Sequence, residues 1–225
     1  MSRFASMKVT GFAVLAFGFA VLPLVGLSDY WIYTVTIGFY YALLAASWSL
    51  LVGYVGRISF AQAAMSGLGG YASALSVIHL GLPVGVGLAM GVVVAGLVGF
   101  ALGWLTLRLH GAYLGLTTIA FGEILRITVT AEHGITEGSL GLRVPALIPD
   151  GSRFDYYYLF LVVTAVCLIA MGLLLRSRVG LFFQSIREDE DGSASLGVDV
   201  TLWKCVAFAV SSAFAGLAGG LYAHF

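Results

Sequence analysis

Long apolar runs separated by short polar intervals dominate this chain. A helix needs about twenty mainly apolar residues to cross the roughly 30 Å hydrocarbon core of a bilayer. Runs of about that length lie at residues 9–27, 31–54, 60–79, 83–107, 112–131 and 156–175, and another begins near residue 203. The pattern therefore predicts an all-α fold. We expect a polytopic transmembrane helical bundle with about seven visible spans, forming a single domain over residues 1–225.

Composition agrees with a membrane protein. Hydrophobic residues make up 60% of the chain and charged residues only 10%, with a mean hydropathy of +1.00, whereas roughly 25% of the residues in soluble domains are charged. This excludes the soluble classes and makes membrane lipids an expected partner. The net charge of zero argues against a nucleic-acid partner. The last run is still apolar at residue 225, so we expect the natural chain to continue.

Lysine and arginine positions predict the orientation, because cytoplasmic loops collect these residues. With the N-terminus in the cytoplasm, only Arg143 and Arg153 fall on the outer side, and Arg126 lies within a span. The remaining bases are then cytoplasmic: Arg3, Lys8, Arg57, Arg108, Arg176, Arg178, Arg187 and Lys204. This orientation places the longest polar interval, residues 176–204, in the cytoplasm.

The third apolar run contains polar residues and glycines. Gln62 and Ser66 interrupt it, together with glycines at positions 67, 69 and 70. Such a segment can be a broken helix that lines a cavity enclosed by protein, where irregular backbone is tolerated at membrane depth. It can equally be a tightly packed helix whose polar side chains bond within the bundle. Both interpretations make Gln62 and Ser66 candidate pathway residues.

Two charged residues fall inside the fifth run. Glu123 and Arg126 are three residues apart, so they share one helix face. A charge at the bilayer centre costs about 2.5–3.5 kcal/mol, so we expect the pair to face the interior of the bundle. The pair is then either a structural ion pair or part of a transport pathway or gate.

Small residues mark expected helix contacts. In the fourth run they recur at every fourth position, at Gly87, Gly91, Ala95, Gly99 and Gly103, a spacing that lets helix backbones approach closely in lipid. Residues 67–71 (GLGGY) also resemble residues 216–222 (GLAGGLY) in the last run. Such an internal similarity is typical of duplicated transporter halves.

The polar interval 176–204 predicts two helices. Val179, Phe182, Phe183 and Ile186 form an apolar stripe at helical spacing over about three turns. Four consecutive acids at 188–191 disfavour continuation, and Asp191 can cap a short second helix that ends at Gly197. An apolar stripe on a charged loop suggests docking onto another protein, although it could instead lie against the membrane interface.

Motifs for catalysis are missing. The chain contains no G-x-x-x-x-G-K-[ST] phosphate loop and no G-x-S-x-G nucleophile motif. Its four histidines have no ligand spacing to one another or to the two cysteines. We therefore expect a protein that is not an enzyme and that has no cofactor or metal of its own.

Four stretches together resemble a known family. Residues 185–190 (SIREDE) and 195–200 (SLGVDV) are similar to the coupling loop of LivM-type permeases, the membrane subunits of branched-chain amino acid ABC importers. Residues 53–71, 119–126 (IAFGEILR) and 213–223 resemble other segments of that family. Arg57, Gln62 and Glu137 depart from its usual residues, and related permeases for urea and short amides share the scaffold.

The resemblance implies an ABC importer permease fold in the bacterial inner membrane, paired with a LivH-type permease. Two cytoplasmic ATPase subunits would bind ATP and magnesium, and a periplasmic binding protein would deliver the amino acid. The expected ATPase-docking residues are Phe182, Phe183, Ile186, Arg187, Glu188, Asp189, Glu190, Ala194, Leu196 and Gly197. The main alternatives are a urea or short-amide permease and a self-contained secondary transporter that uses Glu123 and Arg126.

Overall fold

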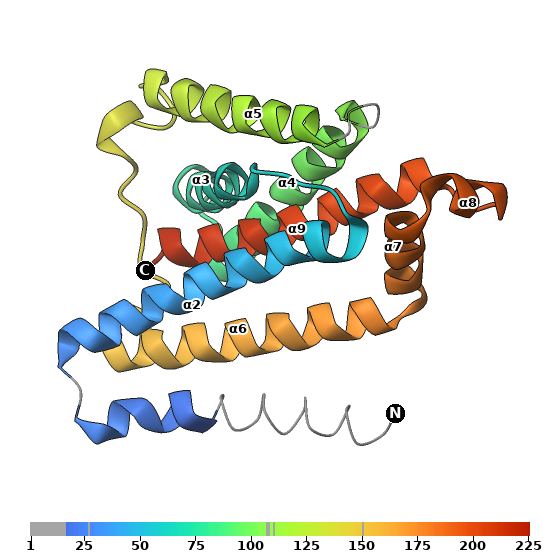
Figure 1. The fold of residues 1–225 in the computed structure, drawn as a ribbon. Coiled ribbons are helices and arrows are strands. Elements are labelled where there is room, and N and C mark those ends of the chain that lie inside the picture. The colour runs from blue at the N-terminus through green and yellow to red at the C-terminus, as the bar shows by residue number, and fades with distance from the viewer. Residues whose placement is uncertain (1–16, 27, 107–108, 110, 150) are drawn as a thin grey trace.

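The computed structural model describes residues 17–26, 28–106, 109, 111–149 and 151–225 (Figure 1). This part of the chain is helical and contains no strand. Residues 17–21 are helical, and the elements that follow are η1 (Leu22–Val25), α2 (Asp29–Ser49), η2 (Leu50–Val55), α3 (Gln62–Leu80), α4 (Val84–Leu105), α5 (Ala112–Ala131), η3 (Gly138–Leu140), α6 (Arg153–Arg176), α7 (Arg178–Glu188), α8 (Glu190–Ser195) and α9 (Val200–Ala223).

Five helices are long and apolar enough to cross a membrane: Asp29–Val55, Val84–Leu105, Ala112–Ala131, Arg153–Arg176 and Val200–Ala223. Five of the seven predicted spans are confirmed by this criterion. The predicted span at 9–27 lies largely outside the described residues. The one at 60–79 corresponds to α3, which is not among the five. Figure 1 shows α3 nearly end-on while α2, α6 and α9 run across the view, so α3 crosses them steeply.

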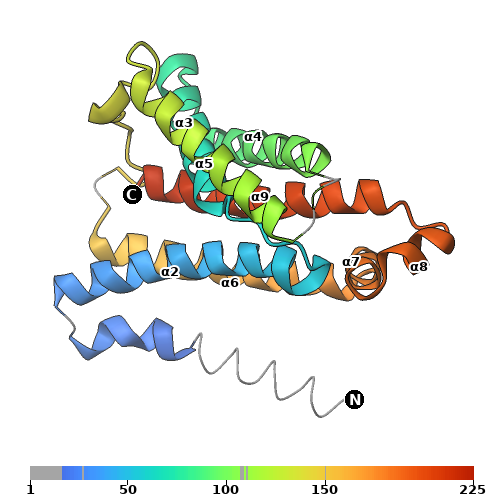
Figure 2. The same cartoon turned by 45° about the horizontal axis from the view of Figure 1, so that its top comes forward.

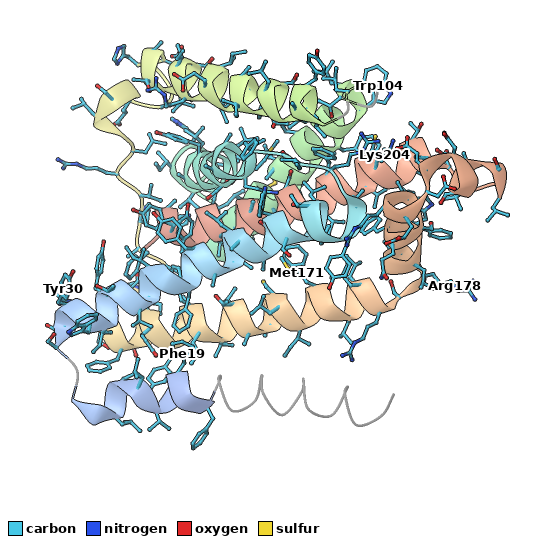
Figure 3. All side chains as sticks on the ribbon, viewed as in Figure 1. Phe19, Tyr30, Trp104, Met171, Arg178 and Lys204 are labelled. Carbon is cyan, nitrogen blue, oxygen red and sulfur yellow. The ribbon has the colours of Figure 1, made fainter. Side chains whose placement is uncertain are left out.

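Exposed aromatic residues lie near both ends of the bundle. Tyr30 and Trp31 lie at the start of α2, while Trp104 lies at the end of α4 and Tyr113 at the start of α5. In Figure 3, the labelled Tyr30 and Trp104 are at opposite ends of the molecule. Tryptophan and tyrosine are enriched at the two membrane–water interfaces. Their positions fit helices that span a bilayer along the long direction of Figure 1.

Local sequence explains where several helices begin and end. Gly56 follows η2 and Gly81 follows α3, both with positive φ, a conformation that costs little without a Cβ. Pro83 precedes α4, where its missing N–H costs no helical hydrogen bond. At the start of α6, Ser152 and Asp155 form a reciprocal capping box.

Helices α3, α4 and α9 form the centre of the bundle and cross one another through glycines. A Cβ added to Gly69 would collide with the backbone of Gly216, and one added to Gly91 would collide with the carbonyl oxygen of Gly69. The buried residues of α4 include all five members of the predicted small-residue stripe. The prediction of a packing face on α4 is therefore confirmed, and α3 and α9 are the helices that pack on it.

Helices α2 and α6 lie side by side in both Figure 1 and Figure 2. The rings of Phe39 and Tyr157 meet edge to face, with centroids 5.5 Å apart. The Tyr157 hydroxyl also donates a 2.7 Å hydrogen bond to the carbonyl oxygen of Phe19, which ties residues 17–21 to this pair. Helix α5 lies on the opposite side of the molecule, packed mainly on α3 and η3.

Candidate functional site

Helices α7 and α8 form a hairpin, residues 178–195, between α6 and α9, as the polar interval predicted. Gly197, with a φ of +85°, follows the second helix and terminates it as expected. The cap at its start differs from the prediction. Asp189, not Asp191, accepts a 2.9 Å hydrogen bond from the amide of Gly192. Asp191 instead lies in the first turn of α8, where a carboxylate interacts favourably with the helix dipole.

The apolar stripe of α7 faces the interior of the chain. Phe183 is completely buried and Ile186 is also buried; Phe183 shares a buried apolar cluster with Leu50 and Leu51 of η2. The ring of Phe182 stacks on Trp203 of α9, with centroids 4.7 Å apart. Assigning Phe183 and Ile186 to a docking surface was therefore wrong for this fold. The stripe finds its apolar partner within the same chain, because η2 and the start of α9 cover it.

Three charged residues join the hairpin to the rest of the bundle. Arg57 donates a 2.6 Å hydrogen bond to Oε2 of Glu190, and the Lys204 ammonium group pairs with Oε1 of the same carboxylate. Arg57 and Lys204 are both buried, and Figure 3 shows Lys204 on α9 beside the hairpin. A second hydrogen bond, 3.0 Å long, joins the Arg57 guanidinium to the carbonyl oxygen of Leu109. We call Arg57, Glu190 and Lys204 the charge cluster.

The remaining predicted docking residues lie at the surface of the hairpin. Arg187 donates to the carbonyl oxygen of Gly53, and its side chain covers Gly56. The exposed residues among those predicted are Arg187, Glu188, Asp189, Ala194, Leu196 and Gly197. Leu196 is 87% exposed. The hairpin is thus fixed to the bundle by one face and exposes a tip that combines acidic side chains with this leucine.

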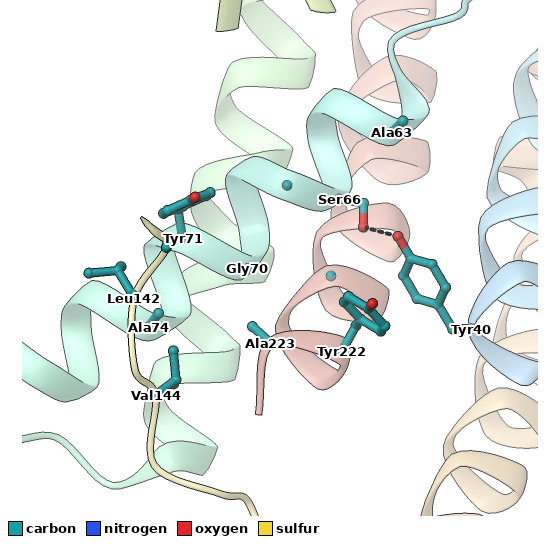
Figure 4. A pocket seen from close by; sticks show the side chains of 13 residues that line it. Tyr40, Ala63, Ser66, Gly70, Tyr71, Ala74, Leu142, Val144, Tyr222 and Ala223 are labelled. Carbon is teal, nitrogen blue, oxygen red and sulfur yellow. Dashed lines mark hydrogen bonds between the residues drawn. The ribbon is translucent and has the colours of Figure 1, made fainter. Parts of the chain in front are cut away.

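A hollow of about 390 Å³ lies between α2, α3, α9 and the loop that joins α5 to α6 (Figure 4). The hydroxyls of Tyr40 and Ser66 are hydrogen-bonded at 3.0 Å in its wall, and the rings of Tyr40 and Tyr222 stack with centroids 4.9 Å apart. We call this space the tyrosine hollow. It is lined by Tyr40, Ala63, Ser66, Gly67, Gly70, Tyr71, Ala74, Gly141, Leu142, Val144, Gly219, Tyr222 and Ala223.

Gln62, the other polar candidate of α3, does not line this hollow. Its amide nitrogen donates a 2.6 Å hydrogen bond to the hydroxyl of Ser211 on α9, whose own proton goes to the carbonyl oxygen of Ser47 on α2. Helix α3 is continuous from Gln62 to Leu80. The structure therefore favours the tightly packed interpretation for Gln62, while Ser66 lies in the wall of a cavity.

Glu123 and Arg126 form the expected ion pair, but not where it was expected. Two hydrogen bonds of 2.6 and 3.0 Å join them, and their side chains are 53% and 65% exposed. The prediction that the pair faces the bundle interior is wrong for the described chain. Helix α5 makes few contacts with the rest of the bundle, mainly with α3 and η3, so its charged pair stays exposed. Arg126 also borders a second hollow, between α3 and α5.

Sequence reasoning missed several residues of these sites. The sequence indicated a cytoplasmic position for Arg57 and Lys204 but no contact with Glu190, because no sequence spacing connects these residues. Tyr71 and Tyr222 did carry a signal, since each ends one of the two similar glycine-rich segments. Those segments pack against each other, with Gly70 next to Gly219. In the described part of the chain, no group of three or more His, Cys, Asp or Glu residues is arranged to hold a metal ion.

Comparison with known proteins shows the family of this chain. The profile of a family described as the permease component of the branched-chain amino acid transport system matches residues 30–225. The LivM permease of Salmonella typhimurium is 31% identical over 214 residues, covering 81% of this chain and 50% of that protein. The Escherichia coli LivM permease is 31% identical over 216 residues, covering 84% and 51%.

A second type of permease is also similar. The LivH permease of Escherichia coli is 26% identical over 214 residues, covering 85% of this chain and 68% of that protein. No solved structure matches the chain. The chain spans about half the length of the LivM permeases from these two bacteria. With its apolar helices and this match over most of its residues, the chain belongs to the branched-chain amino acid transport permease family.

Proposed function

We propose that this protein is a permease subunit of an ABC importer that carries branched-chain amino acids across the bacterial inner membrane. The ATP would be hydrolysed by two cytoplasmic ATPase subunits, and a LivH-type permease would complete the membrane part. A periplasmic binding protein would deliver the substrate. The family match and the similarity to both LivM and LivH permeases support this division of labour.

The attachment of the α7–α8 hairpin is the observation that carries the proposal. A segment that transmits motion from an ATPase must contact the partner and must also be firmly joined to the spans. The charge cluster and the buried ring of Phe183 supply the connection. Removing one member of a buried ion pair typically costs about 3–5 kcal/mol. The hairpin would therefore move together with α9 and with the segment that precedes α3.

The exposed tip supplies the contact. Leu196 projects from the end of α8, and the acidic residues Glu188, Asp189 and Asp191 are exposed nearby. Interface energy is concentrated in a few side chains that fill pockets on the partner. We expect Leu196 to fill an apolar pocket of the ATPase whose rim is basic, so that it complements the acids.

The substitution Leu196→Asp tests this docking. In the complex purified with its ATPase, we expect retention of the ATPase to fall at least about ten-fold, because a charge would enter the pocket. Leu140→Asp is the matched control, since Leu140 is 90% exposed in η3, in the loop between α5 and α6. Equal retention of the ATPase in the two variants would refute docking through this tip.

Uptake into proteoliposomes tests the transported substrate. With the binding protein outside and ATP inside, leucine, isoleucine and valine should be accumulated in preference to urea and short amides. Accumulation of urea or amides alone would assign the chain to the related permeases instead. Uptake that is driven by an ion gradient with the ATPase absent would favour the secondary-transporter alternative.

A further inference from the structure

The walls of the tyrosine hollow differ from the other polar sites of this chain. None of its thirteen lining residues is charged. Tyr40 and Tyr222 lie on one side of it, and Tyr71 lies on the other side, on α3 near Leu142 (Figure 4). Its volume of about 390 Å³ lies near the lower end of the roughly 300–1,000 Å³ found for small-molecule sites. The hollow therefore suits a small solute with an aliphatic part and no net charge.

Hydroxyl groups supply the only side-chain polarity of these walls. Tyr40 and Ser66 bond to each other, whereas the hydroxyls of Tyr71 and Tyr222 make no hydrogen bond to other described residues. Such groups can bond weakly to the polar end of a passing amino acid. Transport requires binding that is favourable enough for entry and weak enough for release. A lining of hydroxyls without charges meets that requirement.

The loop wall of the hollow is anchored beside it. Nδ1 of the buried His224 donates a 2.8 Å hydrogen bond to the carbonyl oxygen of Pro145, and the amide of Leu147 donates to the carbonyl oxygen of His224. Nε2 of the same ring is 2.9 Å from the hydroxyl of Ser73 on α3. Residues 141–144 are thereby held next to α3 and α9, and the hollow has a defined outer wall.

Gly67 lies at an open side of the hollow. Gly70 and Gly219 are glycines for packing reasons, because a Cβ at either would press on neighbouring backbone. A Cβ at Gly67 would meet nothing within 4 Å, although glycine inside a helix costs about 0.5–1 kcal/mol relative to alanine. Packing does not explain this glycine. Gly67 lines both the tyrosine hollow and the hollow between α3 and α5, so a side chain here would project into the open space where the two meet.

We propose that the tyrosine hollow is the place where the aliphatic side chain of the transported amino acid passes through this subunit. The inference rests on the proposed function and adds to it a site and a basis for selectivity. Cationic and anionic amino acids find no compensating charge in this lining, and aliphatic ones find apolar contact. The hollow between α3 and α5 shares Ala63, Gly67 and Tyr71 with the tyrosine hollow, but it differs because Arg126 borders it.

Gly67→Leu places a large side chain where the tyrosine hollow meets the hollow between α3 and α5, without straining the backbone. In the complete transporter we expect leucine uptake to fall at least about ten-fold, the scale on which a pocket discriminates by added methylene groups. Retention of the ATPase and of the partner permease should remain at the wild-type level, because the substitution lies away from the α7–α8 hairpin. Tryptic fragments and thermal unfolding of the complex check that the fold is unchanged.

Two matched variants isolate the hollow. Gly122→Leu fills only the neighbouring hollow between α3 and α5, where its Cβ would make an ordinary 3.6 Å contact with Ala64. Gly172→Leu lies on α6 with nothing within 4 Å of its Cβ. We expect both to transport leucine at rates close to the wild type. Inhibition by Gly122→Leu as strong as that by Gly67→Leu would overturn the assignment.

The remaining outcomes are also decisive. Normal uptake by an intact Gly67→Leu complex would show that substrate does not use the hollow. Loss of the partner permease from the Gly67→Leu complex would mean that this face seats a helix of another subunit, and would overturn the inference. Failure of the wild-type complex to transport branched-chain amino acids would instead overturn the proposed function itself, so the two failures are distinguishable.

Discussion

Helices α9 and α5 are both apolar, both long enough to span a membrane and both carry a charged residue, yet their surroundings differ. In the most apolar stretch of α9, 61% of the residues are buried inside the chain, against 17% for α5. Lys204 of α9 is buried against Glu190, whereas Glu123 and Arg126 of α5 pair with each other at an exposed position. The comparison shows that hydropathy identifies a span but not its neighbours.

The difference has a physical origin in glycine. Helix α9 carries Gly216 and Gly219 where α3 and α4 cross it, so backbones approach closely and cover the helix from several sides. Helix α5 has only Gly115 and Gly122 along its length, and each faces a single side chain, of Phe60 and Ala64 respectively. In lipid, where no hydrophobic force drives helices together, close approach of this kind determines which helices associate.

The largest expected effect concerns the charge cluster on the α9 side. Glu190→Gln would leave the buried cations Arg57 and Lys204 facing an uncharged amide. Because the Glu190 side chain is itself 37% exposed, we expect the free energy of unfolding to fall by about 3 kcal/mol, the lower end of the usual cost of breaking a buried ion pair. Chemical unfolding in detergent micelles, followed by tryptophan fluorescence, measures it. A loss below about 1 kcal/mol would mean that the cluster behaves like a surface pair.

A smaller effect is expected at the crossing of α9 with its neighbours. The added methyl group of Gly216→Ala would collide with Ala95 and press on the carbonyl oxygen of Gly91. Overpacking of this kind costs about 1–3 kcal/mol, measured by the same unfolding experiment. Gly122→Ala on α5 is the control, because its Cβ would make only an ordinary contact. Equal losses of stability in the two variants would contradict the proposed difference between α9 and α5.

The smallest effect is expected for the charges of α5. The double variant Glu123→Gln, Arg126→Gln removes an exposed pair and leaves no unpaired charge behind. Exposed ion pairs contribute little to stability, so the unfolding transition of the isolated chain in detergent should not move measurably. A clear destabilisation would show that α5 depends on this pair. The charged residues of α5 would then stabilise the fold as those of α9 are expected to do.

Local patterns predicted much of the fold. The run at 112–131 coincides with α5, and the small-residue stripe of the fourth run is the buried face of α4. The stripe at 179–186 predicted α7, and Gly197 ends α8 as expected. Each of these features depends on residues a few positions apart, whose geometry in a helix is known in advance.

Contacts between distant residues could not be predicted in the same way. Glu190 meets Arg57 across 133 positions of sequence, and no spacing rule connects them. The stripe of α7 was correctly recognised as apolar, but its direction depended on whether another part of the chain would cover it. Phe183 is buried because η2, the segment that follows α2, lies there. The Glu123–Arg126 pair was predicted to face the bundle interior for a similar reason, because the sequence does not show which side of α5 is covered.

The sequence by itself determined that this is a helical membrane protein, where most of its helices lie and which family it resembles, because hydropathy and helical periodicity are local properties. Only the tertiary structure decided which charges are buried, which face of the α7–α8 hairpin is free and where the tyrosine hollow opens. Those features arise from contacts between residues that are far apart along the chain: the approach of helix backbones at a few glycines, the charge cluster and the burial of Phe183.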